Sequence, residues 1–225
     1  MLSVSRFLPS LAGRRGALGA LGAAALLAGA VPGRAQAPEA SAVFAGGCFW
    51  GVESVFEHVR GVRSATSGYS GGSVADPSYP QVETGGTGHA ESVRVVYDPA
   101  EVSYRQLLAV FFLVAHDPTT RDRQGPDAGP QYRGIVFYQD STQAAQARAY
   151  VAALTAHRAF AQPIVTEVQP FQAFYPAESY HQHYAALHPT QPYIVINDAP
   201  KVERLRRLFP ALYVDGEAAQ PPARP

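Results

Sequence analysis

The sequence predicts an α+β protein: a two-layer α/β sandwich with a mixed β-sheet. Two observations predict this class. Segments with strand and helix periodicity follow one another without strict β-α-β alternation, and the 225-residue chain has no internal repeat. With 47% hydrophobic and 16% charged residues, the composition is that of one globular domain of moderate size. We therefore expect one sheet covered by helices, arranged as a ferredoxin-like core.

The first predicted elements surround the only cysteine of the chain. Residues 41–45 are short, apolar and β-branched, which predicts a buried strand. Apolar side chains then recur at helical spacing over residues 52–59, which predicts a helix that starts near Cys48. Residues 61–72 alternate loosely and predict a strand that runs into a turn. Residues 73–88 are rich in proline and glycine and predict a long loop.

The second half of the chain alternates between strands, helices and polar loops. Alternation over residues 91–97 predicts a half-buried strand, and Ser103 can N-cap the helix that follows. Residues 117–132 form a second long polar loop by composition. The remaining predicted elements are a strand at 133–138, an alanine-rich helix at 141–157, a strand at 164–168, an aromatic segment at 171–184 and an amphipathic helix opened by Asp198 and Pro200.

The N-terminal residues have the pattern of an export signal. Arg14 and Arg15 precede an uncharged Ala/Gly/Leu run at 16–31. Ala35-Gln36-Ala37 offers a cleavage site, and Ala28-Gly29-Ala30 is a second candidate. The chain therefore divides into a signal peptide at 1–37, a folded domain at 38–215 and a Pro-rich flexible tail at 216–225. The adjacent arginines resemble a twin-arginine signal. We expect export, to a bacterial periplasm.

Charge and cysteine content exclude several classes of partner and of structure. The formal net charge is zero, without a basic stripe or an acidic tail, so nucleic acid is not an expected partner. The apolar run at 16–31 is too short and too rich in glycine for stable membrane insertion. With a single cysteine, no structural disulfide is possible within the chain.

That cysteine lies beside the only tryptophan, in Gly46-Gly47-Cys48-Phe49-Trp50-Gly51. The two glycines permit a tight strand-to-helix turn, which places the sulfur at a helix N-terminus, where free N–H groups and the helix dipole favour an anion. We therefore expect Cys48 to ionise more readily than a free thiol and to act as a nucleophile. The alternative is a small buried hydrophobic residue near a core tryptophan. Such a residue would need neither the Gly-Gly turn nor the Phe-Trp pair.

Four segments in order resemble one known family. They are Gly46-Gly47-Cys48-Phe49-Trp50-Gly51; Tyr79 with Thr87-Gly88-His89-Ala90-Glu91; His116-Asp117-Pro118-Thr119 with residues 123–133; and Ala177-Glu178-Ser179-Tyr180-His181-Gln182. Together they resemble peptide methionine sulfoxide reductases of the A type, the enzymes for the S epimer of the sulfoxide. The resemblance covers about residues 42–213, and it implies that 38–215 is a catalytic domain.

The resemblance implies a nucleophile and a proton donor. Cys48 corresponds to the cysteine that attacks the sulfoxide sulfur, and Glu91 corresponds to the family's glutamate. Departure of the oxygen requires a proton, and a carboxyl among aromatic side chains has a raised pKa and can stay protonated near neutrality. Without the family pattern, Glu91 would be interpreted as a solvated strand end.

Five further side chains acquire roles through the resemblance. Tyr79 and Tyr132 match the tyrosines that donate hydrogen bonds to the sulfoxide oxygen, and Asp127 matches their partner aspartate. Phe49 and Trp50 match the aromatic pair that holds the methyl group of the substrate, where sulfur and methyl contact aromatic faces favourably. For each tyrosine, a core position with a satisfied hydroxyl is the alternative.

The reaction would leave a sulfenic acid on Cys48, which condenses with a thiol. Many family members carry a second cysteine near the C-terminus, but the corresponding residues 191–198 contain none, and Glu83 stands where some members have another. We therefore expect no tightly bound cofactor and an external reductant: a thioredoxin-like protein, a glutaredoxin-like protein or a small thiol. The expected substrates are free methionine sulfoxide and proteins or peptides that carry it.

A zinc site is the alternative for the histidines. His181, His183 and His188 lie close in sequence. They lack a nearby cysteine or acidic ligand at helical spacing, so we expect no metal site here.

Two other functions use the same cysteine or its surroundings. A cysteine hydrolase would pair Cys48 with His89, His116 or His181 and would need no reductant. A non-catalytic module would bind methionine peptides in the aromatic pocket and would keep its function without the thiol.

Overall fold

Six strands form one mixed sheet in the computed structural model, which describes residues 39–216. The strands are β1 (Ala40–Gly46), β2 (Val62–Ser70), β3 (Ala90–Tyr97), β6 (Gly134–Tyr138), β7 (Glu167–Pro170) and β8 (Phe174–Pro176). Their order is β7-β6-β1-β3-β2-β8. All neighbours pair antiparallel except β6 and β7, which are parallel. The predicted α+β class and mixed sheet are confirmed.

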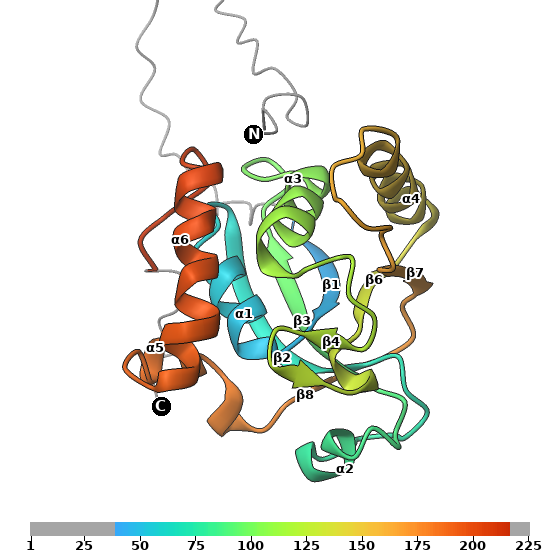
Figure 1. The fold of residues 1–225 in the computed structure, drawn as a ribbon, viewed down its shortest axis with the longest axis vertical. Helices are drawn as coiled ribbons and strands as arrows, with labels where there is room; N and C mark the ends of the chain where they lie inside the picture. The colour runs from blue at the N-terminus through green and yellow to red at the C-terminus, as the bar shows by residue number, and fades with distance from the viewer. Residues whose placement is uncertain (1–38, 217–225) are drawn as a thin grey trace, which may run out of the picture.

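Helices connect and cover this sheet (Figure 1). The α-helices are α1 (Phe49–Glu57), α2 (Tyr79–Glu83), α3 (Tyr104–Val110), α4 (Ser141–Ala156), α5 (Tyr184–Leu187) and α6 (Ala199–Leu208). Shorter helical segments are the π-helices η2 (Phe111–Ala115) and η5 (Ile194–Asp198) and the 3-10 helices η3 (Pro130–Tyr132) and η4 (Ser179–His181). Helix α1 packs on β2 and also contacts α6, which lies beside it in Figure 1. The start of α1 is therefore enclosed by the sheet and by the C-terminal segment.

Strand β1 is buried on both faces. Phe44 belongs to the main core and stacks on Phe56 of α1 and on Phe111, with ring centroids 5.2 and 4.8 Å apart. Val43 and Ala45 point to the opposite face, into a smaller apolar cluster. Burial on both sides accounts for the continuous apolar run of this strand, and it fixes the strand end from which α1 begins.

Two predicted loops contain regular structure. Helix α2 interrupts the loop predicted at 73–88, because Gln81 accepts the Ser78 backbone N–H at 2.9 Å and Pro80 suits a first helical turn. The loop predicted at 117–132 contains the two paired strands β4 (Arg123–Gln124) and β5 (Asp127–Ala128), followed by η3.

The strand predicted at 164–168 starts three residues later and ends two residues later in the structure. Strand β7 starts at Glu167, opposite Ile135 of β6. Residues just before it are not part of the ladder, since the Val165 N–H donates to the Pro118 carbonyl at 2.8 Å. Apolar character alone located the strand but not its register.

No helix within residues 39–216 has the length and apolar character needed to cross a bilayer. The predicted signal peptide at 1–37, and all of the predicted tail except Gly216, lie outside the described residues. The predicted limits of the domain and of its flanking segments remain predictions.

A buried carboxyl on α1 ties this helix to two other segments. Glu53 accepts the Ser67 N–H of β2 at 3.3 Å and the His183 N–H at 3.0 Å. Burial, and secondly the charge of Glu57, raise the pKa of Glu53 from 4.5 to about 8. Between these pH values the folded protein holds a proton that the unfolded chain releases.

The free energy of unfolding is therefore expected to fall as pH rises from 4.5 towards 8, and to level off above that. Between about pH 5.5 and pH 8.5 the loss from Glu53 should be roughly 2–3 kcal/mol. Urea unfolding at several pH values measures it. Glu53→Gln should flatten the pH dependence by that share. An equally steep curve for Glu53→Gln would contradict the assignment.

Candidate active site

Cys48 lies between β1 and α1, as the N-cap residue of α1. Gly47 before it has φ +90°, and a Cβ at Gly47 would lie 2.5 Å from the Gln124 side chain. This turn therefore requires glycine, as the sequence indicated. The Cys48 side chain is 8% exposed and forms no disulfide. The sulfur is thus at the predicted helix N-terminus, but it is buried.

The prediction that Cys48 ionises more readily than a free thiol is wrong. Burial raises its pKa well above the ordinary value, and the nearby carboxyls of Glu91 and Asp198 raise it further. The Trp50 backbone N–H and Lys201 act in the opposite direction but are weaker. Burial therefore destabilises the Cys48 thiolate more than the helix N-terminus stabilises it.

Glu91, near the start of β3, contacts the first turn of α1. Its Oε2 accepts the Phe49 backbone N–H at 3.0 Å. Burial raises the pKa of Glu91 to about 8, with Asp127 and Glu83 contributing and the Phe49 N–H opposing. Its carboxyl is therefore protonated at neutral pH, as expected for a proton donor. Because Oε2 accepts an N–H, the acid proton belongs on Oε1.

Tyr79 and Tyr132 approach the same region from α2 and η3. The Tyr79 backbone N–H donates to Glu178 Oε1 at 2.8 Å, and Tyr69 donates to the other oxygen of Glu178 at 2.8 Å. Burial raises the pKa of Tyr79 and Tyr132, and the charges of Glu91 and Cys48 add to the effect. Both phenols are therefore neutral hydrogen-bond donors within electrostatic range of the thiol. Sequence reasoning did not give Glu178 this anchoring role.

Asp127 has a different partner from the one expected. It accepts a hydrogen bond from the hydroxyl of Tyr193, a residue that sequence reasoning did not select. Burial and the charge of Cys48 raise the pKa of Tyr193. Tyr193 also meets the Trp50 ring edge-on, with centroids 6.0 Å apart. Asp127 therefore fixes a third tyrosine beside the site, not Tyr79 or Tyr132.

Phe49 and Trp50 diverge into an aromatic cluster. Phe49 is buried against His181, with ring centroids 4.9 Å apart, and Trp50 stacks on Tyr184 at 3.8 Å. Trp50 Nε1 donates to His181 Nδ1 at 3.2 Å. Both predicted substrate-binding rings thus belong to one rigid aromatic group next to Cys48.

His181 offers a further hydrogen-bond donor in this cluster. Burial lowers its pKa, so the ring is neutral, and because Nδ1 accepts from Trp50 the proton belongs on Nε2. That nitrogen is buried and has no hydrogen-bond partner among the described residues. An unpaired buried donor next to Phe49 and Tyr79 suits a ligand oxygen.

Two of the three histidines that a cysteine hydrolase could use have both ring nitrogens in other hydrogen bonds. His89 uses its ring nitrogens with the Gly72 N–H and the Val74 carbonyl, at 3.1 and 2.8 Å. The ring nitrogens of His116 form hydrogen bonds with the Phe111 carbonyl and the Thr166 hydroxyl, both at 2.9 Å. Burial lowers the pKa of His116 to about 4. Neither ring is available as a base for Cys48.

The histidines of the zinc hypothesis do not converge. Within residues 39–216, the group of potential ligand atoms that lie within 4.8 Å of one another is Glu53, Glu57 and His183. His181 instead pairs with Trp50, and Glu53 is already bound by two backbone N–H groups. Among the described residues, the three histidines of the zinc alternative therefore do not come together in one site.

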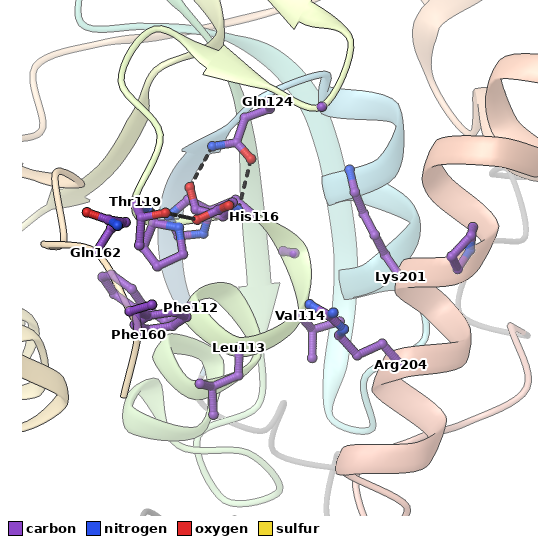
Figure 2. A pocket seen from close by; sticks show the side chains of 16 residues that line it. Phe112, Leu113, Val114, His116, Thr119, Gln124, Phe160, Gln162, Lys201 and Arg204 are labelled. Atoms are coloured by element: carbon purple, nitrogen blue, oxygen red, sulfur yellow. Dashed lines mark hydrogen bonds between the residues drawn. The ribbon is translucent and has the colours of Figure 1, made fainter. Parts of the chain in front are cut away.

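A cavity of about 640 Å³ lies beside the site, between the loop after η2 and α6 (Figure 2). Its lining includes Phe112, Phe160, Gln124, Lys201 and Arg204, but not Cys48. Gln124 is the residue that closes over Gly47. The cavity therefore borders the turn that carries the nucleophile without opening onto the sulfur itself.

Known proteins share this sequence and fold. A family model described as peptide methionine sulfoxide reductase matches residues 40–211. Peptide methionine sulfoxide reductase MsrA 2 of Mesorhizobium japonicum is 54% identical over 173 residues, which cover 77% of this chain and 89% of the relative. The crystal structure of Mxr1 from Saccharomyces cerevisiae in reduced form is 30% identical with a TM-score of 0.62, covering 68% of this chain and 87% of that one. Methionine sulfoxide reductase A of Corynebacterium diphtheriae is 34% identical with a TM-score of 0.61, covering 70% and 79%.

These relatives define the class of protein, an oxidoreductase that acts on sulfur-bound oxygen. Within that class, the chain belongs to the peptide methionine sulfoxide reductase family, of the A type. It is an enzyme that reduces methionine sulfoxide.

Proposed function

We propose that the chain reduces the S epimer of methionine sulfoxide, free and in proteins, through a sulfenic acid on Cys48. One observation carries this proposal. The only cysteine caps α1, and the next backbone N–H is bound by Glu91, a buried carboxyl that keeps its proton near neutral pH. A nucleophile and an acid therefore lie on adjacent positions of one turn.

In this route the Cys48 sulfur attacks the sulfoxide sulfur while Glu91 protonates the oxygen. The attack forms a bond between the Cys48 sulfur and the methionine sulfur, and the sulfur–oxygen bond of the substrate breaks. The protonated oxygen then transfers as hydroxide to the Cys48 sulfur, while the bond between the two sulfurs breaks and releases methionine. Thiol and sulfoxide thus become sulfenic acid and thioether: the cysteine sulfur loses two electrons and the methionine sulfur gains them. Tyr79 and Tyr132 donate hydrogen bonds to the oxygen as charge develops on it.

Phe49 and Trp50 hold the methyl group of the substrate. Their rigid packing against His181 and Tyr184 supports this role, because a fixed aromatic surface orients a sulfur-bound methyl at little entropic cost. Asp127 acts through Tyr193, whose hydroxyl it binds.

An external thiol closes the cycle. The sequence has no second cysteine, so two electrons must arrive from outside to convert the sulfenic acid to thiol and water. A thioredoxin-like or glutaredoxin-like protein, or a small thiol, would supply them. Val195 and Ile196, 50% and 70% exposed on η5 beside α1, support contact with a protein.

We further propose two features around this reaction. The central strands β6-β1-β3-β2, connected through α1 and through α3, support a ferredoxin-like core within a two-layer sandwich. The arginine pair and apolar run before residue 32 support export to a periplasm, where surface methionines are exposed to oxidants.

The separated S and R epimers of a methionine sulfoxide peptide test the proposed function. The purified protein is incubated with each epimer and dithiothreitol, and the methionine formed is counted. Consumption of the S epimer alone is expected. Consumption of neither, or ester or peptide hydrolysis without a reductant, would overturn the assignment.

A further inference from the structure

The sequence contains a single lysine, and its side chain reaches the start of α1. Lys201 belongs to α6, and its Nζ lies 3.3 Å from Asp198 Oδ1. The Asp198 side chain is 1% exposed and that of Lys201 24%. Figure 2 shows Lys201 extending from α6 towards α1, whereas Arg204 points towards Val114.

Gly51 makes room for this ion pair. It is the third residue of α1, and a Cβ there would lie 2.0 Å from Asp198 Oδ1 and 2.7 Å from Lys201 Nζ. Glycine is a poor helix former, and Gly51 does not have the positive φ that would require it. Gly51, the last glycine of the cysteine motif, therefore leaves space for the Asp198–Lys201 ion pair beside the first turn of α1.

Among residues 39–216, the charged groups that act on Cys48 are two carboxyls and one cation. Glu91 comes from β3, Asp198 from the end of η5 and Lys201 from α6, while the phenols of Tyr79, Tyr132 and Tyr193 complete the surroundings. Both carboxyls oppose a thiolate. The positive charge of Lys201 favours it, although less strongly than burial and the carboxyls oppose it.

Asp198 holds the cation while keeping one oxygen free. Its Oδ2 is buried and has no hydrogen-bond partner among the described residues, so Lys201 is the group that the structure offers to balance its charge. A compact ammonium fits the space above Gly51, whereas the planar guanidinium of arginine is larger and has a different donor geometry.

We propose that Lys201, held against Gly51 by Asp198, is a positioning residue for the nucleophile, whose positive charge stabilises the Cys48 thiolate. This inference rests on Cys48 as the nucleophile of the proposed function. It assigns to the C-terminal segment a part in activating the cysteine.

Alkylation tests the inference without any sulfoxide. Because Cys48 is the only cysteine, its rate of reaction with iodoacetamide as a function of pH reports its ionisation alone. Lys201→Gln is expected to shift the profile upward by about one pH unit, which is a rate about tenfold lower near pH 7.5. Asp198→Asn removes a negative charge and should shift it downward. Arg204→Gln, one turn away on the exposed side of α6, is the matched control and should shift nothing.

Opposite shifts in the two variants are the decisive result, because general loosening of the site would move both profiles in one direction. An unchanged or lowered profile for Lys201→Gln would overturn the proposal. If Lys201→Gln does not fold, Lys201→Arg keeps the charge, and its profile must then stay below that of Lys201→Met. A wild-type protein inactive on both epimers would refute the proposed function and leave this electrostatic result intact.

Discussion

Cys48→Ser is expected to abolish reduction of methyl sulfoxides, because a neutral hydroxyl is a poor nucleophile for sulfur. The substitution keeps the size of the side chain, so peptide binding should change little. Methionine formation from the S epimer in the presence of dithiothreitol measures the loss. A binding module would keep its full function in this variant, and sulfoxide turnover by Cys48→Ser would refute the mechanism.

Glu91→Gln is expected to slow the chemical step by about 10²–10⁴-fold, the usual contribution of a general acid. The amide oxygen of glutamine can still accept the Phe49 N–H, so the turn should keep its geometry. Single-turnover measurements with the S epimer isolate this step from reduction of the sulfenic acid.

The same variant makes a second, opposite prediction. Above about pH 8, where the Glu91 carboxyl is ionised, its charge raises the pKa of Cys48. In that pH range alkylation of the thiol should become faster in Glu91→Gln, while sulfoxide reduction becomes slower. A loosened site would speed alkylation of the buried thiol below pH 8 as well, where the Glu91 carboxyl carries no charge to lose. An unchanged single-turnover rate would remove Glu91 from the role of proton donor.

Local patterns predicted the elements that carry the nucleophile. The apolar run of β1, the helical spacing of α1 and the glycine pair before Cys48 each depend on neighbours in sequence, and the structure has all three. The same local reasoning gave the wrong ionisation tendency for Cys48. Its burial and the carboxyls of Glu91 and Asp198 come from distant segments, which a helix-dipole argument does not include.

Contacts between distant segments account for the other differences. Asp127 and Tyr193 are 66 residues apart, and no periodicity relates a loop aspartate to a tyrosine of the C-terminal segment. Glu178 lies 99 residues from Tyr79, whose backbone it holds. Gly51 belongs to a motif that the sequence shows. The reason for a glycine at this position, the space that Asp198 occupies, depends on the folded structure.

The state of Cys48 after one turnover tests the central claim most directly. The reduced protein is mixed with one equivalent of the S epimer, without a reductant and with dimedone present, and Cys48 is then analysed by mass spectrometry. The proposed route predicts one methionine formed for each dimedone adduct on Cys48, and no adduct with the R epimer. Methionine formed while Cys48 remains an unmodified thiol would contradict oxygen transfer to this sulfur.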